Sequence, residues 1–166
     1  MNQTPIMPRS HLQSFVSRGK SGSTSIQSAP GRRASRIFRE GLEVTIGHHA
    51  EVVLLRKFIY WTGSLWDFDQ FMHEEQARRE QVFQGDPPES GWVKKTAADF
   101  LGESIPSLSR HAIRKHLKSL VRKEFLYERE DPVYPWEHAL QYRVNLVKLR
   151  KALARRGYHL DERDFG

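Results

Sequence analysis

Residues 107–129 read SLSRHAIRKHLKSLVRKEFLYER, and their apolar positions follow the period of an α-helix. Ser109 suits the N-cap of such a helix, because its hydroxyl can accept a hydrogen bond from a free backbone N–H of the first turn. Leu108 and Ile113 stand where a hydrophobic staple would close over that cap. The pattern therefore predicts a helix from Ser109 to about Lys123. Its buried stripe would consist of Ile113, Leu117 and Leu120.

The outward face of this predicted helix is basic. It carries His111, Arg114, Lys115, Lys118 and Arg122. A shorter helix is expected just upstream, since Thr96 suits an N-cap, Asp99 suits the first turn, and Pro106 prevents continuation. Two helices joined by a tight turn, the second apolar on one face and basic on the other, are the pattern of a helix-turn-helix.

A strand hairpin is predicted directly after the second helix. Residues 125–129 and 140–145 are strand-like, and ten residues that include two prolines separate them. The second segment alternates between apolar and polar residues, Leu140, Tyr142 and Val144 against Gln141, Arg143 and Asn145. A short strand is expected at residues 91–94, and a last helix over residues 146–156 that stops at Gly157.

Two further helices are predicted upstream. Residues 48–61 carry apolar residues at the spacing i, i+3 and i+7, so this helix is expected deep in the core. Residues 64–84 mix aromatic residues with a charged run and suit a second, more exposed helix. The consecutive prolines within residues 85–88 then require a loop.

Composition bounds the class of protein. The chain has 166 residues and no cysteine, which excludes disulfides, thiolate zinc sites and a cysteine nucleophile. No apolar run approaches the ~20 residues of a membrane-spanning helix, so a soluble, cytoplasmic protein is expected. The net charge is +7, and residues 1–40 alone contribute +6, from seven basic residues against one acidic residue. This balance favours a polyanionic partner, the alternative being a solvated tail that binds nothing.

The N-terminal segment differs in composition from the rest. Residues 1–36 are rich in Ser, Gly, Pro, Gln and Arg, and they cannot bury enough apolar surface to offset the entropy of ordering. We therefore expect a disordered basic arm at 1–36 and one ordered domain at 37–166, with a helical insertion at about 64–84. A transit peptide is the other interpretation of this arm, although its helical amphipathicity is small.

Residues 91–149 resemble the winged-helix modules of phage and mobile-element replication initiators and related regulators. The resemblance is carried by Trp92, by SIPSLSRHAIRKHLKSLVRKEFL (residues 104–126) and by ALQYRVNLVKL (residues 139–149). The stretch LLRKFIYW (residues 54–61) is similar to the first helix of that group. The family usually has glycine where this chain has Glu124, before the first wing strand.

The resemblance implies a mainly helical α+β fold, a winged helix-turn-helix whose hairpin is the wing. It also implies a sequence-specific, non-enzymatic protein that binds duplex DNA and needs no cofactor. Such a protein would act as a replication-initiation factor or transcription regulator of a phage, plasmid or mobile element. It would be nucleoid-associated, as a monomer or homodimer. The alternative is an adaptor that docks on a polymerase, replisome or other nucleoprotein partner. It is supported by the aromatic insertion at residues 64–84 and by the acidic loop at residues 130–138, which is rich in proline and aromatic residues.

The residues expected to contact DNA form three groups. Near the start of the recognition helix, base contacts would come from Ser109, Arg110, His111, Arg114 and Lys115, with Arg114 reading a guanine. Phosphate contacts would come from Lys118, Arg122, Lys94, Lys95 and Thr96. The arm arginines Arg32, Arg33, Arg36 and Arg39 would enter the minor groove.

No metal or catalytic site is expected. His48, His49 and Glu51 lack further ligands at suitable spacing. His111 and His116 point to different faces of the predicted helix, so they cannot share a metal ion. The sequence contains no phosphate-binding glycine loop and no nucleophile motif.

Overall fold

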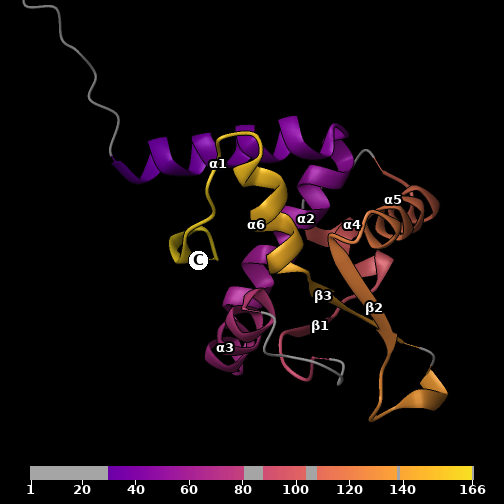
Figure 1. The fold of residues 1–166 in the computed structure, drawn as a ribbon. Helices are drawn as coiled ribbons and strands as arrows, with labels where there is room; N and C mark the ends of the chain where they lie inside the picture. The colour runs from indigo at the N-terminus through magenta and orange to yellow at the C-terminus, as the bar shows by residue number, and fades with distance from the viewer. Residues whose placement is uncertain (1–29, 81–87, 104–107, 138, 166) are drawn as a thin grey trace, which may run out of the picture.

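The computed structural model describes residues 30–80, 88–103, 108–137 and 139–165 (Figure 1). This part of the chain is mainly helical with a small antiparallel sheet, which confirms the expected α+β class. The helices are α1 (Pro30–Ile46), α2 (His49–Gly63), α3 (Phe68–Arg79), α4 (Ala97–Glu103), α5 (Arg110–Arg122) and α6 (Leu146–Ala154). The strands are β1 (Trp92–Lys94), β2 (Leu126–Glu130) and β3 (Leu140–Val144), and short 3-10 turns lie at Pro135–Glu137 and Glu162–Phe165.

The helix expected at residues 48–61 is α2, and it lies at the centre of the core. Its fully buried apolar residues are Leu54, Leu55, Phe58 and Ile59. The Phe58 ring contacts the rings of Tyr142 on β3 and Phe100 on α4, with centroids 5.4 and 5.6 Å apart. The sheet and the α4–α5 pair therefore pack against one common helix.

The three strands form a sheet in the order β1-β3-β2, so β3 is the central strand. Val93 of β1 lies opposite Tyr142, and Leu126 of β2 lies opposite Val144. The hairpin predicted after α5 and the short strand predicted at residues 91–94 are both confirmed. The last helix is confirmed too, as α6, and the backbone beyond it turns at Gly157 with φ +80°.

Strand β3 departs from the one-sided burial that its alternating residues predict. Arg143 is fully buried and Asn145 is 6% exposed, although the alternation places both on the solvent face. Helix α3 and the chain at Ser90 cover this second face. The Arg143 Nε donates a hydrogen bond to the Ser90 carbonyl at 2.7 Å, and the guanidinium lies 4.8 Å from the centroid of the Phe71 ring.

Helix α3 is the helix predicted within residues 64–84, but it is less exposed than its charged sequence indicates. Both Glu74 and Glu75 form ion pairs with Arg143. Helix α3 also lies close to the backbone at Gly91, where a Cβ atom would be only 2.3 Å from the Phe71 ring. The insertion is thus tied to the sheet. Of the predicted loop at 85–88, residues 85–87 lie outside the described residues.

Helix α1 begins at Pro30, within the stretch predicted to be disordered, so the expected boundary at residue 37 is wrong. Proline suits the first position of a helix, because its φ is already helical and its missing N–H would have no partner there. Phe38, Leu42 and Ile46 are buried at four-residue spacing and anchor the helix. The helix continues upstream of this anchor into a segment with few apolar residues, which hydrophobic periodicity cannot detect. Residues 1–29 of the predicted arm lie outside the described residues.

The turn between α5 and β2 explains what Glu124 does in place of glycine. The Phe125 N–H donates to the Leu120 carbonyl at 3.0 Å, and the Glu124 N–H donates to the Val121 carbonyl at 2.9 Å. This pair of bonds is a Schellman motif, which places the Glu124 position in the left-handed region, here with φ +62°. The Glu124 carboxylate accepts a hydrogen bond from Lys148 Nζ at 2.6 Å, which lowers the pKa of Glu124.

The substitution Glu124→Gly is expected to raise the melting temperature by about 2–4 °C, because glycine adopts the left-handed conformation without strain. The exposed ion pair with Lys148 contributes little by comparison. Glu124→Gln is the control, since it removes the ion pair and keeps the strain. Thermal unfolding followed by circular dichroism checks both. A glycine variant that melts below the wild type would show that the ion pair outweighs the backbone strain.

Candidate nucleic-acid interface

Helix α5 is positioned by the local signals that its sequence contains. The Ser109 hydroxyl accepts a hydrogen bond from the Ala112 N–H at 3.2 Å, which confirms the predicted N-cap. The predicted buried stripe is also confirmed by Ile113, Leu117 and Leu120. The helix packs against α2 and α4, so one face is fixed in the core and the opposite face lies at the edge of the molecule (Figure 1).

A buried carboxylate on α2 holds the C-terminal end of α5. Glu51 is 3% exposed and accepts a hydrogen bond from Lys123 Nζ at 2.6 Å. His116 Nδ1 lies 3.7 Å from the same carboxylate, and the rings of His48 and His116 are 4.5 Å apart. Burial by itself would raise the pKa of Glu51, but the hydrogen bonds from Lys123 and Ser119 outweigh it, and the pKa is lowered. Lys123 is therefore engaged within the fold and is not a free cation for a ligand.

The Glu51 carboxylate gives the protein a testable dependence on acid. Because its pKa is lower in the folded state, the stability it contributes is present above the ordinary value of 4.5 and is lost as the pH falls through the folded value. We expect Glu51→Gln to lower the free energy of unfolding by about 1–3 kcal/mol at pH 7. The difference from the wild type should shrink as the pH falls below about 4.5.

Urea unfolding of both proteins between pH 7 and pH 3 measures this difference. Glu130→Gln is a matched control, because Glu130 is exposed and has no ion pair with a residue that the structure describes. A gap that stays constant or widens toward acid pH would contradict the assignment of Glu51.

The outward face of α5 is a row of basic side chains. Its exposed members are Arg110, His111, Arg114, Lys115, Lys118 and Arg122. None of them forms an ion pair with any of the described residues, and the helix contains no acidic residue. Arg110, Arg114, Lys118 and Arg122 follow one another at four-residue spacing, so like charges face each other along one side of the helix. The expectation of an apolar inner and a basic outer face is confirmed. This arrangement leaves mutual repulsion that a bound polyanion would relieve.

Three residues just before α4 are predicted to contact phosphate, namely Lys94, Lys95 and Thr96. In the structure their side chains contact other parts of the protein. Lys94 Nζ lies 3.1 Å from Asp131 and 3.0 Å from Glu137, so it is paired with the loop between β2 and β3. The ammonium of Lys95 lies 4.7 Å from the centroid of the Trp61 ring.

Thr96 is confirmed as the cap of α4, because its hydroxyl oxygen accepts a hydrogen bond from the Asp99 N–H at 3.4 Å. Its backbone N–H donates to the Asp99 carboxylate at 2.6 Å, and its hydroxyl donates to the same oxygen at 2.9 Å. The backbone hydrogen bond from Thr96 is the main reason that the pKa of Asp99 is lowered. The Thr96 N–H is therefore used within the fold, and the phosphate contact of Thr96 stays a prediction.

The arm arginines are not brought to the basic face of α5. Arg36 and Arg39 are exposed on α1, and Arg32 and Arg33 lie on the first turns of the same helix. The N-terminal end of α1 lies on the opposite side of the molecule from α5 (Figure 1). A helix is about 10–12 Å wide with its side chains, whereas the minor groove is about 6 Å wide. A whole helix is therefore too wide for the minor groove, and insertion of the arginine side chains alone stays a prediction.

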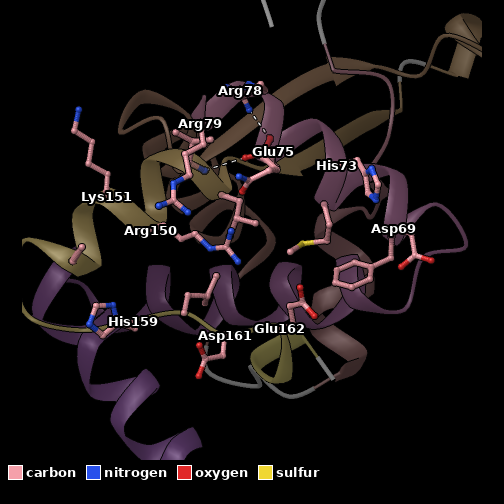
Figure 2. A pocket seen from close by; sticks show the side chains of 17 residues that line it. Asp69, His73, Glu75, Arg78, Arg79, Arg150, Lys151, His159, Asp161 and Glu162 are labelled. Carbon is pink, nitrogen blue, oxygen red and sulfur yellow. Dashed lines mark hydrogen bonds and ion pairs between the residues drawn. The ribbon is translucent and has the colours of Figure 1, made fainter. Parts of the chain in front are cut away.

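A hollow lies between α3, α6 and the C-terminal segment, with a volume of about 1280 Å³ (Figure 2). Its rim combines basic Arg79, Arg150 and Lys151 with acidic Asp161 and Glu162. The mixed charge shows no preference for an anion or a cation. In the described part of the chain, no group of three or more His, Asp or Glu side chains is arranged to hold a metal ion. The hollow therefore lacks the uniform positive charge that the outward face of α5 presents to a ligand.

The site contacts that sequence reasoning did not predict join residues far apart in the chain, such as Glu51 and Lys123. A glutamate inside an apolar helix face, as at Glu51, is the one available signal, because a buried carboxylate needs a cation or donors. Among the helices that the structure describes, none is both long and apolar enough to span a bilayer.

No family model, curated protein or solved structure matches this chain. The basic face of α5 is therefore interpreted from its own geometry.

Proposed function

We propose that this chain is a winged helix-turn-helix protein that binds duplex DNA in a sequence-specific manner. In this proposal α4 and α5 are the helix-turn-helix and the β2–β3 hairpin is the wing, with β1 completing the sheet. The observation that carries it is the row of cations on α5 that form no ion pair within the described part of the chain, directly opposite the buried stripe that anchors this helix. The order of the elements supports the same interpretation.

The residues of α5 divide by their distance from its N-terminus. The major groove is about 12 Å wide and admits a helix, whose first turns approach the base edges. Ser109, Arg110, His111, Arg114 and Lys115 are assigned to this region, and Arg114 is the bidentate reader of a guanine. Lys118 and Arg122 lie further along the helix and are assigned to phosphates, which position the protein without reading sequence.

The biological role is proposed on the resemblance alone. It is replication initiation or transcription regulation for a phage, plasmid or mobile element, by a nucleoid-associated protein. The adaptor role remains the second candidate, because the wing loop has the opposite charge from α5 and presents exposed aromatic rings.

Selection of the full-length protein against a random duplex library tests the proposed function. We expect an enriched motif at about 100 mM salt, since phosphate contacts still contribute at that ionic strength. A palindromic motif would show that a dimer binds, and direct repeats would favour an origin-binding initiator. Retention of duplexes without any enriched motif would contradict sequence-specific binding. Failure to retain any duplex would contradict DNA binding itself.

A further inference from the structure

The loop between β2 and β3 ends in an exposed aromatic surface, which projects away from the helices (Figure 1). We call it the aromatic tip, and it consists of Val133, Tyr134 and Trp136, which are 63%, 45% and 70% exposed. The rings of Tyr134 and Trp136 contact each other edge to face, with their centroids 5.6 Å apart. A cluster of this kind on a soluble protein is typical of an interaction site.

The aromatic tip is held in place by hydrogen bonds and ion pairs at its base. The Asp131 carboxylate accepts hydrogen bonds from the backbone N–H groups of Val133 at 2.9 Å and Tyr134 at 3.4 Å. Lys94 bridges Asp131 and Glu137, and its ammonium lies 5.2 Å from the centroid of the Tyr134 ring. Because the loop is braced before a partner arrives, little conformational entropy is lost on binding.

The charged residues around the aromatic tip favour a partner of positive charge. Residues 128–137 contain four acidic residues and one basic residue, and adding Lys94 leaves a local charge of −2. The basic residue, Arg129, is turned back into the fold, where it lies 4.0 Å from the centroid of the Trp92 ring and donates to Gln141. Glu128 and Glu130 are exposed. This surface repels phosphates and attracts cations.

We propose that the aromatic tip binds a basic protein segment, in which arginine side chains stack on the indole of Trp136 and pair with the exposed carboxylate of Glu130. A guanidinium suits this surface, because it is planar, stacks on aromatic faces and is more weakly hydrated than an ammonium. The wing then recruits a protein partner. This inference does not depend on DNA binding by α5, because the two surfaces belong to different elements and have opposite charge.

The test measures binding of a fluorescently labelled synthetic peptide of alternating arginine and glycine to the full-length protein. A second peptide carries citrulline in place of every arginine, which keeps the planar side-chain end and removes the charge. We expect the arginine peptide to bind at least 10-fold more tightly than the citrulline peptide. Trp136→Ala should weaken binding of the arginine peptide by about 10-fold, and Glu130→Gln should weaken it about 3-fold.

The control variant is Trp66→Ala, which removes another tryptophan that is 93% exposed, far from the wing in sequence. It should bind the arginine peptide as the wild type does. The proposal is overturned if Trp136→Ala and Trp66→Ala behave alike, or if the citrulline peptide binds equally well. It is also overturned if Trp136→Ala loses affinity for duplex DNA and keeps its affinity for the peptide. In that case the aromatic tip is a DNA contact.

Discussion

Arg143→Met is expected to lower the free energy of unfolding by about 3 kcal/mol, because it removes the buried cation that pairs with Glu74 and with the buried Glu75. Arg143 is fully buried, and its guanidinium forms ion pairs with both Glu74 and Glu75. The effect should lie at the low end of the range for buried ion pairs. Glu75 keeps a hydrogen bond from Arg78 at 2.6 Å and another from the Val147 N–H at 3.0 Å.

Urea unfolding of two further variants makes this prediction specific. Arg150→Met is the matched control, because Arg150 is partly exposed and has no ion pair with a described residue, so its removal should change stability by less than about 0.5 kcal/mol. Adding Glu74→Gln to Arg143→Met should restore part of the loss, since Arg143 is the cation that pairs with Glu74 among the described residues and a neutral amide is less costly to bury than a carboxylate. Equal stability of the Arg143→Met and Arg150→Met variants would contradict a structural role for this ion pair.

Through this ion-pair cluster, α3 holds the sheet and α6 together. The helix supplies Glu74 and Glu75 to Arg143 on the central strand, and the Glu75 carboxylate reaches the backbone at the start of α6. The base of the β2–β3 hairpin is thus held from the side opposite α5. Loss of the cluster should loosen the hairpin while leaving the capping interactions of α5 in place.

The elements that the sequence predicts correctly are those specified by residues close together in the chain. Helix α5 is defined by a cap at Ser109, a periodic apolar stripe and a Schellman turn at Glu124, all within one short stretch of chain. Each of these signals depends on neighbours within about five residues, so the sequence contains them directly.

The features that were not predictable depend on distant partners. The alternation in β3 indicates one buried face, but α3 covers the other, and this depends on how the helix folds back. Lys94 is a residue type that binds phosphates, yet its ammonium is paired with Asp131 and Glu137, which lie far from it in the sequence. The start of α1 at Pro30 was missed because helix propagation from a buried anchor extends past the apolar pattern.

The double substitution Arg114→Ala, Lys118→Ala is expected to weaken duplex binding by about 2–4 kcal/mol, which is roughly 30- to 900-fold. The two residues should contribute in different ways. Arg114→Ala should relax the preference at one base pair, because a bidentate contact to guanine contributes about 1–3 kcal/mol of discrimination. Lys118→Ala should weaken all duplexes alike and reduce the slope of log affinity against log salt by about 1, because one phosphate contact fewer releases fewer counterions.

Titration of the selected duplex and of a scrambled duplex between 50 and 200 mM salt separates these contributions. The charge-matched control is Arg155→Ala, Arg156→Ala, which removes two exposed cations just beyond α6 and should leave affinity and salt slope nearly unchanged. Since Arg114 and Lys118 are exposed, both double variants should unfold at the wild-type urea concentration. If the two double variants lose affinity equally, binding depends on net charge alone and α5 is not a recognition helix. If only the Arg114→Ala, Lys118→Ala variant loses affinity, the basic face of α5 is the site of contact, because net charge is the same in both.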